Sequence, residues 1–366
     1  MIATVVVMLL CCFFFATIMQ KGVPERMPIA VVDLDKTTTS RNVIHQLNSM
    51  QMVQVTKVCN SYAEARDMLQ RGDIYGFMLI PRGFYNKLAG LKRPTLSVYT
   101  NNTYTVGANM AYKQLLTMCN LVAGALQLEV FTAVGLTEEQ AMTLIQPIVM
   151  ENHQIGNPKA NYAIYLVGTI LPGILGLIVL TTTVFSIGLE LKDKTSREWL
   201  DVAGGSMPVA LIGKLLPYNL IYLALGICCN MLLFEVMDLP VAGSFLLMSL
   251  AMLVYVCAMQ AIAVLFIGLI PTVRTALSIS ALYGMLAFSM SGFTYPPMAM
   301  LPAFRALTWL FPLGHYYHVY ANEALLNGPI ENTILPMIWM LLALIPQLFI
   351  VERLRYAAIN LNYSPK

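Results

Sequence analysis

Charged residues are scarce in this chain. Aspartate, glutamate, lysine and arginine make up only 11% of its 366 residues, whereas 58% are hydrophobic and the mean hydropathy is +0.67. Ordinary soluble domains carry about 25% charged residues, so this composition excludes that class. The net charge of only +3 gives no sign of the strongly basic surface that binds nucleic acid. The chain is therefore predicted to be an integral membrane protein that binds no nucleic acid.

The cysteines do not form the pattern of a disulfide framework. Five of the seven lie inside apolar runs: Cys11, Cys12, Cys228, Cys229 and Cys257. Only Cys59 and Cys119 have polar surroundings, and these two could form a disulfide in an oxidising compartment.

The sequence also lacks a nucleotide-binding motif of its own. A phosphate loop has the pattern G-x-x-x-x-G-K-[ST] on a turn between a strand and a helix. Gly205 and Gly213 stand too far apart for that pattern, and Leu215 occupies the position of the hydroxyl residue after Lys214. The chain is therefore predicted not to hydrolyse ATP, not to be an enzyme, and to hold no cofactor itself.

Long apolar runs dominate instead. A helix needs roughly 20 mostly apolar residues to span a bilayer. Six segments meet this requirement: residues 1–20, 162–188, 209–236, 243–270, 275–292 and 333–350. The first is interpreted as a retained anchor, because no positive region precedes it and no small-residue cleavage site ends it.

Lysine and arginine set the predicted orientation of these spans. They gather in residues 189–208, in the turn 271–274 and in the tail after 350, whereas residues 237–242 have none. Cationic loops stay in the cytoplasm, so these three segments are predicted to be cytoplasmic. The long segment 21–161 then lies on the opposite side of the membrane.

Residues 28–102 alternate short β-rich runs with amphipathic helical stretches. The predicted strands are 28–35, 52–59, 75–81 and 94–102, and the predicted helices are 40–50, 61–72 and 83–90. This alternation indicates a small α/β layer with a largely parallel sheet. Two further helical stretches, 104–132 and 137–150, lead back to the membrane.

The predicted fold is an α-helical polytopic membrane protein with six transmembrane helices and an inserted extracytoplasmic α/β domain. Its parts are the first span (1–20), the outer domain with its helical stalk (21–161), a five-helix transmembrane domain (162–350) and a cytoplasmic tail (351–366).

Two motifs admit a chemical and a structural interpretation. Asp33-x-Asp35-x-Thr37 after a buried strand resembles the opening signature of haloacid-dehalogenase-type phosphatases, but no paired acidic motif follows to complete a metal site. The alternative is that the carboxylates cap a strand-to-helix turn. His315 and His318 have a helical spacing that could hold a metal, or they belong to an interfacial aromatic belt.

The order of motifs resembles the type-2 ABC transporter permeases, in the branch with a large outer domain between the first two spans. The resemblance covers nearly the whole chain. It rests on Ala30-Val31-Val32-Asp33 with Ser40-Arg41, Gly72 to Phe84, Lys194 to Glu198, Gly213 to Pro217, Ser291-Gly292-Phe293 with Pro296, and Phe311-Pro312-Leu313 with Tyr316.

The resemblance implies that residues 189–208 form a cytoplasmic coupling loop, whose short helix sits in a cleft of a separate ATP-binding subunit. The coupling residues would be Glu190, Lys194, Thr195, Ser196, Glu198, Trp199, Leu200, Gly213 and Lys214. Trp199, Leu200 and Val202 are expected to be apolar anchors for the partner. The alternative is an ordinary solvated loop on the positive-inside face. The resemblance also implies an outer re-entrant region at 293–331, with Gly292, Phe293, Pro296, Pro312 and Tyr316.

The expected partners follow from the same resemblance. They are an ATP-binding cassette subunit that carries ATP and magnesium, a second permease chain (identical or paralogous), membrane lipids and, by analogy, a periplasmic adaptor. The expected function is export of an amphipathic or hydrophobic substrate, such as a drug, lipid or natural product, from the bacterial inner membrane. The few charges within the spans suit ATP coupling better than ion coupling. The alternative is a membrane-anchored receptor or scaffold whose outer domain binds ligand.

Overall fold

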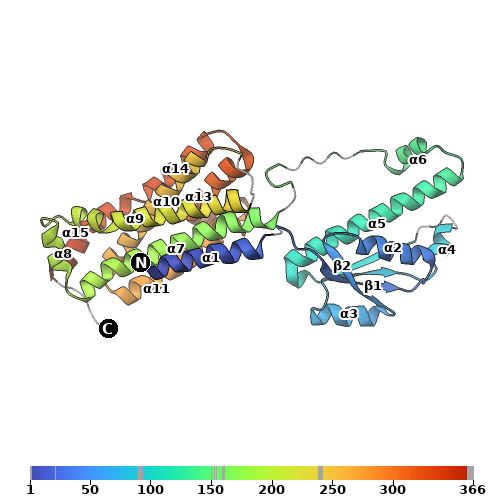
Figure 1. Ribbon diagram of the computed structural model, residues 1–366, viewed down its shortest axis with the longest axis horizontal. Coiled ribbons are helices and arrows are strands. Elements are labelled where there is room, and N and C mark those ends of the chain that lie inside the picture. The colour runs from blue at the N-terminus through green and yellow to red at the C-terminus, as the bar shows by residue number, and fades with distance from the viewer. Residues whose placement is uncertain are drawn as a thin grey trace. The chain divides into compact units, whose positions relative to one another are not determined.

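The computed structural model describes residues 2–360 apart from 21, 90, 91, 93, 150, 152, 154, 159, 160 and 238–241. The chain divides into two compact units (Figure 1). Met1–Gly22 and His153–Lys366 form the bundle unit, and Val23–Asn152 form the inserted unit.

The described residues of the bundle unit form helices joined by irregular segments, with no strand among them. Its longer helices are α1 (Ile2–Ile18), α7 (Tyr162–Lys192), α9 (Met207–Met231), α10 (Phe245–Leu269), α11 (Val273–Met290), α14 (Glu331–Leu342) and α15 (Ile345–Asn360). Its shorter elements are α8 (Ser196–Val202), the π-helical turn η2 (Leu232–Val236), the 3-10 turn η3 (Pro297–Ala299), α12 (Pro302–Thr308), α13 (Pro312–Tyr320) and the π-helical turn η4 (Ala321–Leu326).

Six helices in the described residues are long and apolar enough to cross a membrane. Five of them correspond to predicted spans: Tyr162–Lys192, Met207–Glu235, Phe245–Leu269, Val273–Met290 and Glu331–Asn360. The sixth, Asn102–Ala133, falls in the inserted unit, where it packs on a sheet. The first predicted span is α1, which has 17 residues and stands at the short end of the range for spanning helices.

The last helical segment extends further than predicted. The apolar run stops near residue 350, whereas α15 continues to Asn360 through Glu352, Arg353 and Arg355. The predicted tail at 351–366 therefore begins inside a helix, because a helix can continue into water after its apolar segment ends.

Helix α7 lies at the centre of the bundle, and small residues let aromatic side chains approach it. A Cβ at Gly168 would overlap the ring of Tyr320, and one at Gly176 would overlap the hydroxyl group of Tyr255. The Tyr255 hydroxyl donates to the carbonyl oxygen of Pro172 at 3.0 Å. Close packing through small residues is the usual source of helix association in membranes, so these glycines fix how α10 and α13 pack on α7.

The inserted unit contains a four-stranded sheet. Its strands are β1 (Met27–Asp33), β2 (Val53–Cys59), β3 (Gly76–Ile80) and β4 (Ser97–Thr100), in the order β2-β1-β3-β4. Strand β1 is parallel to β2 and β3, and β4 is antiparallel to β3. Its helices are α2 (Thr38–Asn48), α3 (Tyr62–Arg71), α4 (Phe84–Ala89), η1 (Asn102–Tyr104), α5 (Thr105–Ala133) and α6 (Glu138–Ile145).

Alternate residues of β1 face two separate cores. Ile29 and Val31 pack with α2 and α5, including Leu115, whereas Ala30 and Val32 pack with α3. Apolar residues of α5 thus cover one face of the sheet, while only 17% of its most apolar 18-residue window is buried.

This arrangement excludes the disulfide considered between Cys59 and Cys119. Both thiols are free. Cys59 belongs to the core on the α3 side of the sheet, and Cys119 packs against the core on the α5 side. The sheet therefore separates the two sulfur atoms.

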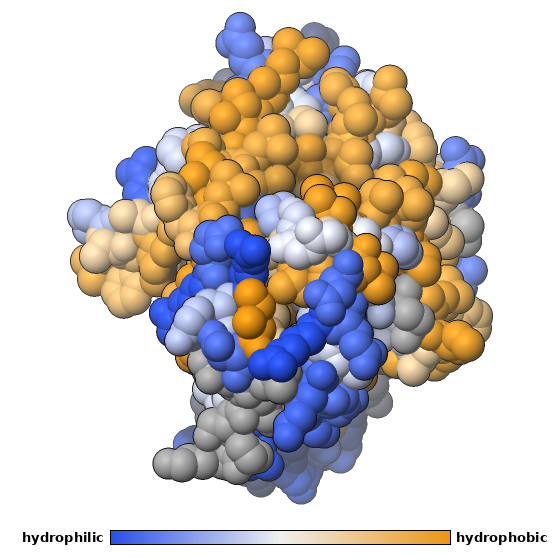
Figure 2. All heavy atoms as spheres, turned by 90° about the vertical axis from the view of Figure 1, so that its left-hand side faces the viewer, coloured by the Kyte–Doolittle hydropathy of each residue, from blue (hydrophilic) through white to orange (hydrophobic). Residues whose placement is uncertain are grey.

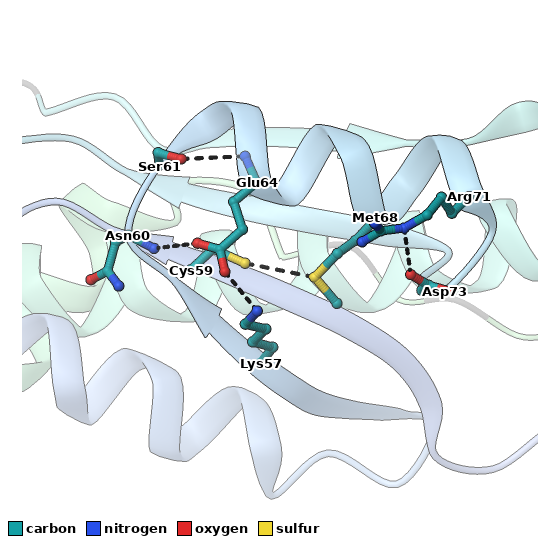
Figure 3. Close-up of polar contacts among 8 residues, drawn as sticks. All are labelled: Lys57, Cys59, Asn60, Ser61, Glu64, Met68, Arg71 and Asp73. Atoms are coloured by element: carbon teal, nitrogen blue, oxygen red, sulfur yellow. Dashed lines mark hydrogen bonds and ion pairs between the residues drawn. The ribbon is translucent and has the colours of Figure 1, made fainter.

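Helix α3 begins with a reciprocal pair of caps (Figure 3). The Ser61 hydroxyl accepts from the Glu64 backbone at 3.3 Å, and the Glu64 carboxylate accepts from the Asn60 backbone at 3.1 Å. Lys57 lies 2.6 Å from the same carboxylate. The hydrogen bond from Lys57, followed by the one from Asn60, lowers the pKa of Glu64. The hydrogen bonds to the charged Glu64 carboxylate therefore stabilise the fold at neutral pH. This stabilisation is lost as the pH falls through the lowered pKa of Glu64.

The boundary of the inserted unit differs from the predicted one at 161. Residues from His153 onward join the bundle unit, where Tyr162 donates its backbone N–H to the Gly22 carbonyl at 2.6 Å. Asn157 and the backbone of Asn161 exchange two hydrogen bonds of 2.8 Å. These contacts hold the segment before α7 to the end of α1.

Candidate functional site

The charged segment between α7 and α9 folds into a defined helix with a left-handed residue on each side. Lys194 has φ 63° before α8, and Gly204 and Gly205 have φ 65° and 74° after it. The Gly205 N–H bonds the Leu200 carbonyl at 2.9 Å, which closes the last turn of α8. Glycine takes a left-handed conformation at no steric cost, so the Gly204-Gly205 pair suits a sharp stop before Met207.

A polar cluster joins α8 to the neighbouring helices α7 and α9. The carboxylate of Glu190 on α7 accepts from the Lys214 ammonium of α9 and from the Thr195 hydroxyl. Lys214 also lies 5.1 Å from the centre of the Trp199 ring, which places a cation over an aromatic face. Both charged side chains are largely covered, with exposed fractions of 25% for Glu190 and 16% for Lys214.

Helix α8 also bonds the end of α15. The buried hydroxyl of Ser196 donates to the Ala358 carbonyl at 2.9 Å, and the Arg197 Nε donates to the Ile359 carbonyl at 2.7 Å. These carbonyls belong to the last turn of a helix, where no intrahelical donor remains. Helix α8 is thus held by α7, α9 and α15 together. Sequence reasoning missed the α15 contact, since 162 residues separate the partners and no local pattern marks them.

The outward face of α8 consists of different residues. Glu198, Asp201 and Lys194 are exposed, and Val202 is 91% exposed. Figure 2 looks onto this end of the molecule and shows hydrophilic residues gathered at its centre between hydrophobic flanks. A helix end fixed by its neighbours and exposed on one face is suited to receive a partner.

The structure places the nine predicted coupling residues in four different settings. Glu190, Thr195, Ser196, Trp199 and Lys214 hold α8 in place, and Lys194 and Glu198 face outward. The expectation that Leu200 is an anchor for a partner is wrong. Leu200 is 4% exposed and belongs to the bundle core, because it lies on the inward face of α8. Gly213 lies on an open face of α9, with nothing within 4 Å of where a Cβ would stand.

The predicted re-entrant region folds around the buried helix α13. Pro312 stands in the first turn of α13, where its missing N–H leaves no acceptor unpaired. Tyr316 is 1% exposed and donates to the Asn230 side chain at 3.2 Å. Gly292 turns the chain with φ 89°, and the Tyr165 hydroxyl donates to the Phe293 carbonyl at 2.5 Å. Pro296 precedes the turn η3. The five predicted residues thus shape one connection rather than a single cluster.

A buried carboxylate next to α13 escaped the sequence analysis. Glu323 is 6% exposed and accepts from the Thr333 hydroxyl and, at 3.0 Å, from the Ser244 backbone. Its own carbonyl accepts from the Gly243 N–H at 2.6 Å. Glu323 therefore joins η4, α14 and the start of α10. The sequence feature that could have marked this site is a single glutamate that stands among aromatic and apolar residues.

The aspartates of the phosphatase-like motif serve the fold of the inserted unit. One Asp33 oxygen accepts from the backbone N–H groups of Asp35 and Lys36 at 3.0 and 2.9 Å, and the other accepts from the Ser40 hydroxyl at 2.8 Å. Asp35 accepts from the Phe84 backbone at 2.9 Å, at the start of α4. Both Asp33 oxygens are thus already occupied, which favours the capping interpretation over a nucleophile.

We expect Asp33→Asn to destabilise the inserted unit by about 1 kcal/mol, because an amide group would replace one accepting oxygen. Thermal unfolding of the purified chain measures this, with Asp67→Asn at an exposed site of α3 as the control. A p-nitrophenyl phosphatase activity that Asp33→Asn abolishes would contradict the capping role.

The two histidines on α13 lie among aromatic side chains. The Nε2 of His315 lies 3.1 Å from the Trp309 carbonyl, and its ring packs near Trp339. Within the part of the chain that the structure describes, no group of three or more His, Cys, Asp or Glu side chains could hold a metal ion. The arrangement agrees with an aromatic cluster.

A search of curated proteins found no match to this chain. The family model described as ABC-2 family transporter protein matches residues 1–350, which is nearly the whole sequence. The five long apolar helices of the bundle unit agree with a multi-pass membrane protein of this kind. The chain belongs to the ABC-2 family of transporter proteins.

Proposed function

We propose that α8 is the coupling helix through which a separate ATP-binding subunit drives this permease. Proteins of the ABC-2 family are membrane permease components of ABC transporters and work with a separate ATP-binding subunit. The observation that carries the proposal is the attachment of α8 and its N-cap to three helices at once: Thr195 to Glu190 of α7, Trp199 to Lys214 of α9, and Ser196 to α15.

This attachment suits the transmission of force. A flexible loop would move by itself when a partner displaces it. A displacement of α8 is instead transmitted to α7, α9 and α15, because α8 contacts all three directly. Rigid-body rocking of helices is one of the known forms of transport transition. The exposed residues Lys194, Glu198, Asp201 and Val202 would then meet the ATP-binding subunit, with Val202 as the apolar contact.

The position of α8 along α7 supports a sided arrangement. Helix α8 follows the C-terminal end of α7, whereas the chain leaves for the inserted unit beside its N-terminal end, at Gly22. The 31 residues of α7 span about 46 Å, more than the thickness of the hydrocarbon core. We place α8 and the C-terminal end of α15 in the cytoplasm, because lysine and arginine gather in these segments. The inserted unit then lies outside.

The complete transporter is proposed to contain two permease chains, identical or paralogous, and two ATP-binding subunits that hold ATP and magnesium. It would lie in a bacterial inner membrane and export an amphipathic or hydrophobic substrate. Residues 293–331 would shape the outer exit of the pathway, and the inserted unit would be available to a periplasmic adaptor.

Co-purification tests the coupling role of α8. The tagged chain is isolated from its native cell in mild detergent, and the associated proteins are identified by mass spectrometry. We expect an ATP-binding subunit with the wild-type chain and its loss with the double variant Asp201→Arg/Val202→Glu, because both changes lie on the outward face. Arg274→Glu, a charge reversal in the first turn of α11 next to the other short loop of the same side, is the control and should retain the subunit. Absence of the subunit from the wild type would favour the receptor or scaffold alternative.

A further inference from the structure

A groove lies on the side of the bundle between α9, α10 and α15. Its walls include Leu211, Leu215 and Asn219 from α9, Cys257 and Gln260 from α10, and Gln347 from α15. Its volume is about 420 Å³, within the range of small-molecule sites. At its rim, Leu216 is 55% exposed and Leu348 is 67% exposed, so the groove opens on an apolar side of the bundle.

The floor of this groove carries a buried amide pair. Asn219 is 8% exposed and Gln260 is 5% exposed. The Asn219 amide donates to the Gln260 oxygen at 3.0 Å and to the Cys257 sulfur at 3.2 Å. Within the described part of the chain, the Gln260 amide donates a single, long hydrogen bond of 3.4 Å to the Leu215 carbonyl.

The pair leaves hydrogen-bonding capacity unused. Among the described residues, no donor reaches the oxygen of Asn219. This oxygen is not fully buried, so a hydrogen-bond donor in the groove can reach it, and an amide oxygen accepts up to two hydrogen bonds. Polar side chains facing a cavity within a membrane bundle typically mark a substrate path.

The lining also limits the kind of ligand. All the residues that line the groove are uncharged, and most are aliphatic. A charged ligand group would be buried there without a counter-ion, which is strongly unfavourable. An N–H or O–H group on an otherwise apolar molecule would instead satisfy Asn219 and leave the remainder against leucine and valine.

We propose that this groove is a binding site for an uncharged amphipathic molecule that donates one hydrogen bond to Asn219. The proposal rests on the proposed transport function, of which it names the substrate class and an entry site. Asn219 stands twelve residues after the start of α9, about 18 Å along the helix from the α8 end. The two helices that flank it on the outside, α9 and α15, both contact α8: Lys214 of α9 lies over the Trp199 ring, and Ser196 donates to the Ala358 carbonyl of α15. Movement of α8 would therefore widen or narrow the groove.

The probe is N-phenyl-1-naphthylamine, a neutral aromatic molecule with a single N–H donor whose fluorescence rises in apolar surroundings. Binding is measured on the purified full-length chain in detergent without nucleotide. We expect saturable binding that Asn219→Leu weakens about fivefold, as the loss of one hydrogen bond predicts. Leu216→Trp, at the exposed rim, should abolish saturable binding by filling the groove. Thr183→Val, a buried polar-to-apolar change in α7 away from the groove, should leave it unchanged.

A second readout does not depend on a folded Asn219 variant. In a chain that keeps Cys257 as its only cysteine, the probe should slow the reaction of Cys257 with N-ethylmaleimide. Probe binding that neither Asn219→Leu nor Leu216→Trp alters, or no protection of Cys257, would overturn the proposal. The probe assay needs no ATP-binding subunit. If the probe assay fails while the subunit still co-purifies with the chain, the groove proposal is refuted and the coupling role of α8 is not. Probe binding without any co-purified subunit refutes the coupling role of α8 instead.

Discussion

Replacement of Glu323 by alanine should destabilise the bundle by about 3 kcal/mol, the largest effect expected of a single change outside the aliphatic core. The carboxylate accepts from the Ser244 backbone at the start of α10 and from the Thr333 hydroxyl of α14. Truncation leaves both donors buried without an acceptor, and it removes a negative group from the N-terminus of α10, where the helix dipole favours one. The Asn322 amide donates to the Thr333 hydroxyl at 2.9 Å, so the position of Asn322 would also become less fixed.

Thermal unfolding in detergent, followed by tryptophan fluorescence, measures this loss. Glu323→Gln should have a smaller effect, since the amide keeps one accepting oxygen. Glu331→Ala, at an exposed position in the first turn of α14, is the matched control and should change the midpoint little. Equal midpoints for the alanine variants at 323 and 331 would contradict a structural role for the buried carboxylate.

The second large effect is expected at the ion pair that holds α8. Glu190→Ala removes the acceptor of both Lys214 and Thr195, so the Lys214 charge would remain partly covered without its partner. A lost charged hydrogen bond in such a setting costs about 1.5–2 kcal/mol. The opened state of the segment should then be populated more than tenfold more often, since about 1.4 kcal/mol corresponds to tenfold.

Limited trypsin digestion reports this opening, because Lys194 and Arg197 are cleavage sites within the segment. We expect cleavage there to be more than about tenfold faster in Glu190→Ala. Glu198→Ala removes an equally charged residue from the outward face and should digest at the wild-type rate. The double variant Glu190→Lys/Lys214→Glu should recover part of the protection by restoring an ion pair. Unchanged digestion of Glu190→Ala would show that the pair does not anchor α8.

Local patterns predicted the elements of this protein better than their contacts. Apolar length marked α7, α9, α10 and α11, because a bilayer demands long hydrophobic helices whatever their neighbours are. The same signal placed α15's end too early, since its last turns continue in polar sequence to Asn360. It was also ambiguous for α5, which is as apolar as a span and yet packs on the sheet with Leu115.

The candidate site was located by its charge and its flanking glycines, but its inner organisation was not. The sequence of α8 could not show that Leu200 faces inward and Val202 outward, because a seven-residue helix has too few turns to reveal a periodic face. Nor could it pair Ser196 with Ala358, or Glu323 with Ser244, since these contacts join distant segments. Only the packed bundle distinguishes the residues that hold α8 from those that remain available to a partner.

Site-specific photo-crosslinking from α8 tests the central claim most directly. A benzoylphenylalanine is placed at Val202, which is 91% exposed on the outward face of α8, and, as the control, at Leu220, which is 59% exposed on α9. Irradiation of native cells followed by mass spectrometry identifies the captured protein. The coupling role predicts an adduct with a protein that carries a phosphate-loop motif from position 202, and none from position 220. No such adduct from 202, or the same adduct from both positions, would contradict it.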